Sequence, residues 1–222
     1  MVDIGKLAGK PVVAVITSMA QPLGTHIGNA LEVKDAIDVL AGRTQGDLLE
    51  ISLLLGSHML VLAEKAKTLP EARAMLENAL SSGAGLRKLA EMIAAQGGDP
   101  RVVEDLSLLP QAAVKRVMRA ETAGYLSAMD TTALGMAAQR MGAGRAKKSD
   151  MLDYSVGYVL HVRLGDEVTE DTPLATLYAR NEAEAEEAEK AIRKALTIAG
   201  EKPSVPPLWD AVVTAEGITY NR

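Results

Sequence analysis

The sequence contains no cysteine and no phenylalanine, and its aromatic residues are limited to five tyrosines and one tryptophan. The lack of cysteine excludes disulfides, thiolate nucleophiles and cysteine-ligated zinc or iron–sulfur sites. The scarcity of aromatic side chains removes the platforms on which nucleic-acid bases stack. The charge balance, 24 basic against 29 acidic residues, also disfavours binding to a phosphate backbone. We therefore expect no nucleic acid among the partners of this chain.

The sequence also shows no export signal and no membrane-spanning run. Residues 1–19 lack the basic, apolar and small-residue regions of a secretory signal. The most apolar window, 47–63, is interrupted by Glu50, Gly56 and His58 and falls short of the roughly 20 residues that span a bilayer. We interpret this window as a buried helix and expect a cytoplasmic protein that does not contact membranes.

The 222 residues include 48% hydrophobic and 24% charged residues, as in an ordinary globular protein of one or two domains. Residues 11–17, PVVAVIT, are β-branched without polar alternation, which predicts a strand covered on both faces in a parallel sheet. Helical spacing dominates the rest of the first half. We expect a partial α/β domain over 1–117, mostly helical with one buried strand.

The pattern changes near residue 121. Strand candidates follow at 124–129, 153–160, 174–179 and 211–220, and two helix candidates separate them at 132–141 and 182–199. The second helix candidate places its acids before its bases, which complements the helix dipole. We expect an α+β domain with a hammerhead-like arrangement over 118–222, so that the whole fold class is α/β plus α+β.

The usual catalytic constellations are absent from the pattern. The three histidines, His26, His58 and His161, lie in three separate segments and form no HxxxH or HExxH pair. We interpret His58 as a satisfied core or interface residue, and His161 has no partner that the sequence reveals. The segment 142–145, GAGR, follows a helix instead of opening one, which indicates a helix end more than a phosphate loop. No residue is predicted to be catalytic.

Two segments could bind small groups. In 23–35, LGTHIGNALEVKD, a glycine-containing loop exposes carbonyl groups, and Asp35 on the following helix adds a carboxylate, the oxygen ligands that hard cations take. Spacing alone favours a role of Glu32 and Asp35 as solvated helix charges over a cation site. Residues 164–178 have the rhythm of a lipoyl or biotinyl carrier, but Lys147 and Lys148 lack the hairpin setting of a carrier lysine.

Several stretches together resemble one family. They are MAQPLGTHIGNALEVKDAIDVL, GSHMLVLAEKA, LPQA at 109–112, and the long AETAGYLSAMDTTALGMAAQRMGAGRAKKSDMLDYSVGYVLHVRLGDEV. In this order they are similar to the C-terminal half of pyrimidine-nucleoside phosphorylases and thymidine phosphorylases, over about residues 2–199. The resemblance implies a pentosyltransferase that cleaves uridine or thymidine with inorganic phosphate to the free base and a (deoxy)ribose 1-phosphate.

The resemblance also limits which sites this chain can hold. The phosphate-binding segment of the family, KxSTGGxGD, and the side chains that hold the pyrimidine precede the matching region and do not occur in this sequence. No substrate-binding residue is therefore predicted. One family site does map onto the chain, a potassium ion held by the backbone carbonyls of Leu23 and His26 and by the carboxylate of Asp35. Asp35 stands where many members have Glu, which shortens its reach by one methylene group.

The resemblance implies a fragment whose first segment is part of the phosphorylase α/β domain and which is inactive without the N-terminal half of the enzyme. It also implies a homodimer. The alternative is a non-catalytic structural or interaction module that associates with itself, because a strand that lacks its neighbours presents a bare apolar edge.

Overall fold

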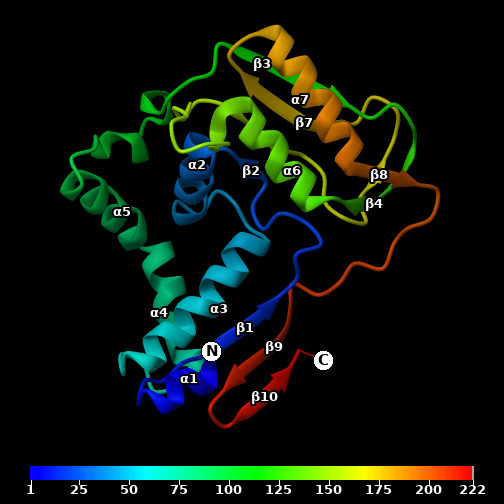
Figure 1. Cartoon of the computed structure of the whole chain (residues 1–222). Helices are drawn as coiled ribbons and strands as arrows, with labels where there is room; N and C mark the ends of the chain where they lie inside the picture. Colours follow the sequence, from blue (N-terminus) through cyan, green and yellow to red (C-terminus); the bar gives the residue numbers. More distant parts are fainter. Residues whose placement is uncertain (222) are drawn as a thin grey trace. The chain divides into compact units, whose positions relative to one another are not determined.

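A computed structural model describes residues 1–221 and gives mixed helices and antiparallel sheets (Figure 1). The elements, in chain order, are α1 (Val2–Leu7), β1 (Ala14–Thr17), β2 (His26–Ile27), α2 (Asn29–Leu40), α3 (Asp47–Leu62), α4 (Leu69–Ser81), α5 (Ala84–Ala95), short 3₁₀ turns at Pro100–Val103 and Leu106–Leu108, β3 (Val114–Arg119), β4 (Gly124–Met129), α6 (Thr131–Ala138), a π-type turn at Gln139–Ala143, β5 (Gly157–Leu160), β6 (Glu167–Val168), β7 (Pro173–Ala179), α7 (Glu182–Ala195), β8 (Leu196–Ala199), β9 (Trp209–Thr214) and β10 (Gly217–Tyr220). The expected fold class, α/β plus α+β, is confirmed.

The chain divides into two compact units, each built from segments that are distant in sequence. The first unit comprises 1–18, 39–88 and 206–221, and the second comprises 19–38 and 89–205. The predicted domains 1–117 and 118–222 follow the order of the sequence and stay a prediction. No described helix has both the length and the apolar character needed to cross a membrane.

The first unit contains a three-stranded sheet in the order β1-β9-β10, with every pair antiparallel. The prediction of a buried strand in a parallel sheet is wrong for residues 11–17, because β1 pairs with β9 and its Ile16 is 48% exposed. Residues 211–220 are not one strand either. A turn before Gly217, whose φ is +149°, folds them into the hairpin of β9 and β10.

Helices α3 and α4 pack against each other in the first unit. The core here is small and consists of Val39, Leu49 and Leu53, with Leu76 and Leu80 packed against it. The predicted helix at 47–63 is therefore only half-buried. Thr68 begins α4 by accepting a hydrogen bond from the Glu71 N–H at 3.3 Å, which caps the first turn of the helix.

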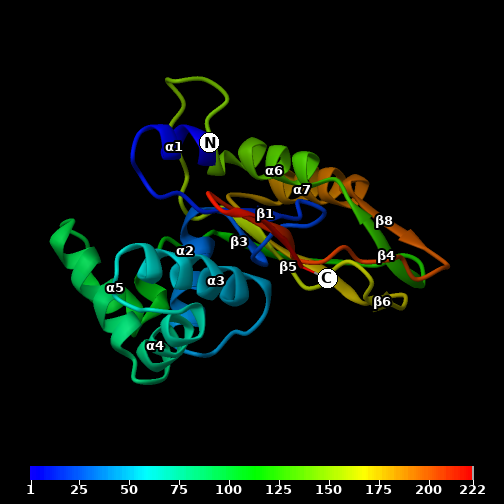
Figure 2. The same ribbon diagram turned by 90° about the horizontal axis from the view of Figure 1, so that it is seen from below.

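The second unit holds the main core between a four-stranded sheet, β2-β5-β7-β3, and helices α6 and α7 (Figure 2). Tyr158, Leu177 and Ile192 are fully buried there. A separate three-stranded sheet has the order β6-β4-β8. The predicted helix at 182–199 ends at Ala195, because residues 196–199 pair with β4 as β8. Strand β3, which pairs with β7, was not expected.

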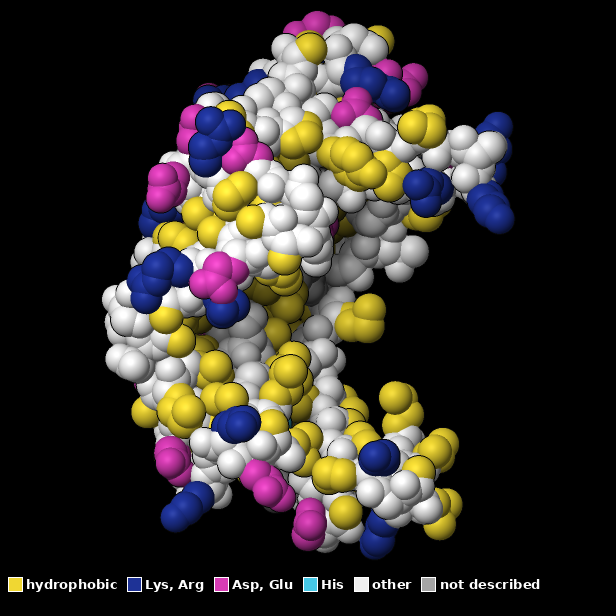
Figure 3. All heavy atoms as spheres, turned by 90° about the vertical axis from the view of Figure 1, so that its left-hand side faces the viewer, with side chains coloured by type: hydrophobic (Ala, Val, Ile, Leu, Met, Phe, Trp, Pro, Cys, Tyr) yellow, Lys and Arg dark blue, Asp and Glu magenta, His cyan; other side chains and the backbone are white. Residues whose placement is uncertain are grey.

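Charged side chains of both signs lie interspersed on the face shown in Figure 3, and hydrophobic side chains reach the surface between them. About half of the exposed large hydrophobic side chains belong to the first unit, although it contains well under half of the residues. Among them are Met1, Leu7 and Met59, exposed by 95, 89 and 68%. The first unit therefore buries its apolar side chains less completely than the second.

Candidate functional site

The loop that precedes β2 is held within the second unit by contacts from residues more than a hundred positions away. The Arg163 guanidinium donates to the carbonyl of Pro22 at 2.7 Å and to that of Leu23 at 3.5 Å. The Gln21 side-chain oxygen accepts from the backbone N–H of Leu164 at 2.9 Å. These contacts hold the carbonyl groups of the loop in place. The sequence carries no signal for Arg163, because only the tertiary fold brings it to the loop.

Strand β2 and the start of α2 follow directly. His26 pairs with Val159 of β5, and the Leu160 N–H donates to the Thr25 carbonyl at 2.8 Å. Gly28 connects β2 to α2 with a φ of +138°, a conformation that favours glycine. A Cβ added at this position would lie 2.5 Å from the Val156 carbonyl oxygen, so only glycine fits here without strain. The side chains of His26 and Asp35 are thereby fixed relative to β5.

Two of the three predicted ligand residues come together. His26 Nδ1 lies 3.5 Å from Asp35 Oδ1, and these side chains are only 12% and 5% exposed. The same Nδ1 lies 3.0 Å from the Thr25 hydroxyl. The contact between His26 and Asp35 runs through the imidazole, whereas the prediction assigned His26 its backbone carbonyl. The contact recorded for the Leu23 carbonyl is the one to Arg163.

The His26 imidazole does not provide the Asp35 carboxylate with a permanently charged partner. Burial lowers the pKa of His26, the charge of Asp35 opposes the shift, and Lys34 adds to the lowering. The imidazole is therefore neutral near pH 7. A buried carboxylate beside a neutral ring requires further compensation, from donors or from a bound cation. The Asp35 carboxylate is an oxygen ligand of the kind that a hard cation prefers.

The remaining histidines differ from their predicted settings. The His58 Nε2 is covered but has no hydrogen-bond partner within residues 1–221, so His58 is not a satisfied core histidine there, and its alternative role as an interface residue stays a prediction. Burial lowers the pKa of His58. His161, for which the sequence offered no partner, has its Nε2 2.7 Å from the Thr176 hydroxyl. Gly142 ends the helical segment with a φ of +106°, as expected for a helix end.

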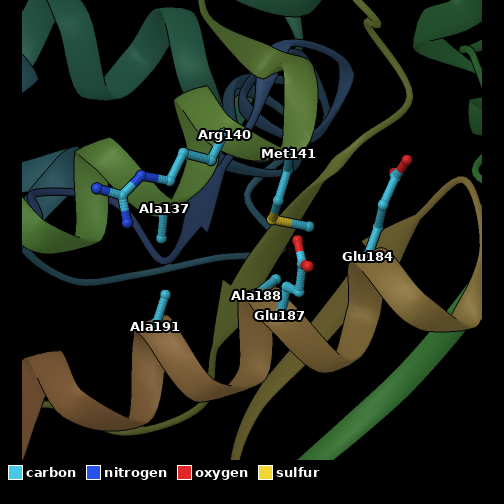
Figure 4. A pocket seen from close by; sticks show the side chains of 7 residues that line it. All are labelled: Ala137, Arg140, Met141, Glu184, Glu187, Ala188 and Ala191. Atoms are coloured by element: carbon cyan, nitrogen blue, oxygen red, sulfur yellow. The ribbon is translucent and has the colours of Figure 1, made fainter.

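A small cavity of about 150 Å³ lies between α6 and α7 (Figure 4). It exists because three short side chains, Ala137, Ala188 and Ala191, face each other across the two helices. Glu187 extends from α7 towards α6, and the Arg140 guanidinium points away from it. The cavity therefore brings no acid, base and nucleophile together. Within residues 1–221, no cluster of three or more His, Asp or Glu side chains could hold a metal.

Comparison with known proteins places the chain. The profile of the family described as pyrimidine nucleoside phosphorylase C-terminal domain matches residues 125–199. The pyrimidine-nucleoside phosphorylase of Geobacillus stearothermophilus is 49% identical over 182 residues, which are 82% of this chain and 42% of the relative. The Bacillus subtilis (strain 168) enzyme is 50% identical over the same lengths, and that of Staphylococcus aureus (strain USA300) is 42% identical over 96% of this chain and 49% of its own.

The chain thus spans less than half the length of these curated relatives. The match extends well beyond the C-terminal domain, because the Staphylococcus aureus enzyme aligns with 214 residues of the chain. The chain therefore corresponds to the C-terminal part of the pyrimidine-nucleoside phosphorylase family, which confirms the resemblance that its sequence predicts.

Proposed function

We propose that this chain is the C-terminal portion of a pyrimidine-nucleoside phosphorylase and acts together with an N-terminal half. The complete enzyme would cleave uridine or thymidine with inorganic phosphate, giving the free base and a (deoxy)ribose 1-phosphate in the cytoplasm. The observation that carries this proposal is the 42–50% identity to proteins of that name over most of the chain. The chain alone is inactive, because the phosphate- and pyrimidine-binding motifs of the family do not occur in it.

In this proposal the chain contributes a scaffold and a cation site. Potassium would be held by the carbonyls of Leu23 and His26 and by the carboxylate of Asp35. When bound, the ion supplies a fixed positive charge. Arg163 orients the loop carbonyls, and the buried imidazole of His26 holds the Asp35 carboxylate in place. We further propose the division into domains 1–117 and 118–222, and a homodimer in the complete enzyme.

The activity is tested by the phosphate-dependent release of uracil or thymine. The assay is run on the pure chain and again after addition of the N-terminal half of the Bacillus subtilis relative, made separately. We expect no release by the chain alone and release on mixing. Turnover by the pure chain would refute its proposed inactivity, and the absence of turnover in a mixture whose two parts demonstrably bind each other would refute the proposed assembly.

The cation site is tested separately through stability. A ligand that binds only the folded chain stabilises it by about 2.7 kcal/mol at a concentration one hundred times its dissociation constant. We expect potassium chloride to raise the melting temperature of the wild-type chain more than choline chloride does at equal ionic strength. Asp35→Asn should abolish this difference, whereas Asp38→Asn, on the same helix, should retain it. An equal response of wild type and Asp35→Asn would refute the site.

A second candidate function, a self-associating module, is favoured by the exposed apolar residues of the first unit. Strand β1 lies at the edge of its sheet, and Ile16 in it is 48% exposed. Such an edge can pair with a second copy. Sedimentation velocity over a range of concentrations tests this function, and a strictly monomeric profile at high concentration would refute it.

A further inference from the structure

A second hollow in the second unit belongs neither to the cation site nor to the proposed phosphorolysis. It has a volume of about 390 Å³ and is bounded by the start of α2, by the segment 106–112 and by residues of β3 and β7. This volume lies in the range of small-molecule pockets, about 300 to 1,000 Å³.

The charged residues that line this pocket are both lysines. They are Lys34 from α2 and Lys115 from β3, and no carboxylate lines the pocket, although the chain carries a net charge of −5. Neither lysine has a carboxylate within 4 Å among the residues that the structure describes. Lys115 Nζ instead lies 5.6 Å from the centre of the Tyr178 ring. The pocket therefore has positive charge that the described side chains do not neutralise by pairing.

The nearest polar groups do not cancel this charge directly. Ser107 and Ser155 line the pocket, and their hydroxyls donate to Asp105 and Asp153, each at 2.6 Å. Each carboxylate oxygen also accepts the backbone N–H of the same serine at 3.0 Å. The two aspartates are thus engaged in local turns next to the pocket and do not line it.

The positive charge of Lys115 affects the pKa of the neighbouring His161. Burial lowers the pKa of His161, and the positive charge of Lys115 lowers it further. Lys115 therefore lies close enough to His161 for its positive charge to act on the imidazole.

Apolar side chains form the rest of the wall. Leu31 is buried to 7% exposure, and Leu109 and Pro110 face the pocket from the segment after the second 3₁₀ turn. The Tyr178 ring adds an aromatic surface. Lys34 and Lys115 line the same pocket, and their flexible stems allow the ammonium groups to turn towards a bound anion. One ligand can therefore meet both lysines and the apolar wall.

We propose that this pocket binds a small organic phosphate with an apolar or aromatic body. Lys34 and Lys115 bind the phosphate group, and Leu31 and Tyr178 contact the body. A phosphate monoester fits better than a carboxylate because it carries close to two negative charges at neutral pH, which match two lysines. The proposal does not rest on the phosphorylase activity, since binding requires only residues of this chain.

Phenyl phosphate is the probe, and isothermal titration calorimetry of the full chain at low ionic strength is the measurement. Inorganic phosphate and phenol serve as comparators that carry only the charge or only the ring. We expect phenyl phosphate to bind more tightly than either. The double variant Lys34→Gln/Lys115→Gln should weaken binding about tenfold or more, and salt should weaken it as well. Lys65→Gln, which removes an exposed lysine outside the pocket, should leave the affinity unchanged.

Amide chemical shifts of the ¹⁵N-labelled wild-type chain locate the binding without relying on a variant. Phenyl phosphate should shift the amides of Leu31, Ser155 and Tyr178 in a saturable manner. Shifts confined to other residues would overturn the proposal. So would equal affinity of wild type and the double variant, a Lys65→Gln effect as large as that of the double variant, or inorganic phosphate binding as tightly as phenyl phosphate. Failure of this test leaves the phosphorylase assay unaffected, so the two proposals are distinguished.

Discussion

The close pairing of β2 with β5 offers the sharpest test of how the fold holds the candidate site in place. Gly157 begins β5 with a φ of +148°, a conformation that side chains rarely adopt. A Cβ at this position would overlap the carbonyl oxygen of Ile27 and lie 2.9 Å from the Cα of Gly28. Both neighbours are backbone atoms, so neither can rotate away. Gly157→Ala must therefore strain the residue itself or push β2 from β5.

The loss of unfolding free energy expected for Gly157→Ala is the sum of two contributions, the backbone strain at residue 157 and the steric overlap of the added methyl group. Holding a non-glycine residue in such a region costs about 1 to 3 kcal/mol. An added methyl group in a packed site costs about 1 to 3 kcal/mol more. We expect the unfolding free energy to fall by roughly 2 to 6 kcal/mol in urea denaturation. If β2 moves instead, His26 leaves Asp35 and the response to potassium is lost as well.

Gly135→Ala is the matched control. Gly135 lies inside α6, its φ is not positive, and an added Cβ would meet no atom within 4 Å. The same substitution should there stabilise the chain by about 0.5 to 1 kcal/mol, because alanine favours the helix. The two variants must change stability in opposite directions. A loss of less than about 1 kcal/mol for Gly157→Ala would refute the argument, because that is the smallest cost of the strain alone.

Three further predictions concern stability. The fold lowers the pKa of the His58 imidazole below its ordinary value of 6.5, so the unfolded chain binds a proton at this residue more readily than the folded chain. The contribution of His58 to the unfolding free energy is therefore complete above pH 6.5 and is lost as the pH falls. His58→Leu should make the unfolding free energy less sensitive to pH between 7 and 5, and an unchanged dependence would contradict this. Asn181→Ala removes the acceptor of the Glu184 N–H at 3.0 Å and should cost about 1 kcal/mol in thermal unfolding, with no loss if the cap contributes nothing. Tyr158→Phe removes the 2.8 Å hydrogen bond to the Leu134 carbonyl and should cost about 0.5 to 1.5 kcal/mol in urea denaturation; a stabilising effect would be inconsistent with this role.

Local patterns predicted the helices better than the strand partners. The start of α7 follows from Asn181 and from the acidic residues of the first turn, both of which act within a few positions. Its end does not, because residues 196–199 leave the helix to pair with β4, about seventy positions away. Strand β1 was expected from its β-branched residues, but its partner β9 lies almost two hundred positions further on. Pairing over such distances leaves no trace in a window of ten residues.

The candidate site was found only in part for the same reason. Asp35 and its loop were identified as a cation site through the family resemblance, since spacing alone favoured a solvated helix charge. The short distance between the His26 imidazole and Asp35 depends on the backbone conformation of Gly28, which connects β2 to α2. The contact of Arg163 with the loop joins residues about 140 positions apart. Such contacts arise from tertiary packing, which residue patterns do not encode.

In both proposed functions, the split phosphorylase and the self-associating module, a partner would cover the exposed apolar residues of the first unit, but the partner differs. That unit has a core centred on Val39, Leu49 and Leu53, whereas the second unit buries a much larger set around Leu177 and Ile192. A small core contributes little stability, so the first unit gains most from a partner that covers its apolar surface. A second copy of the chain and an N-terminal half could both do so. The mixing assay and sedimentation velocity separate the two partners, because only the N-terminal half would restore phosphorolysis and only a second copy would raise the mass of the chain alone.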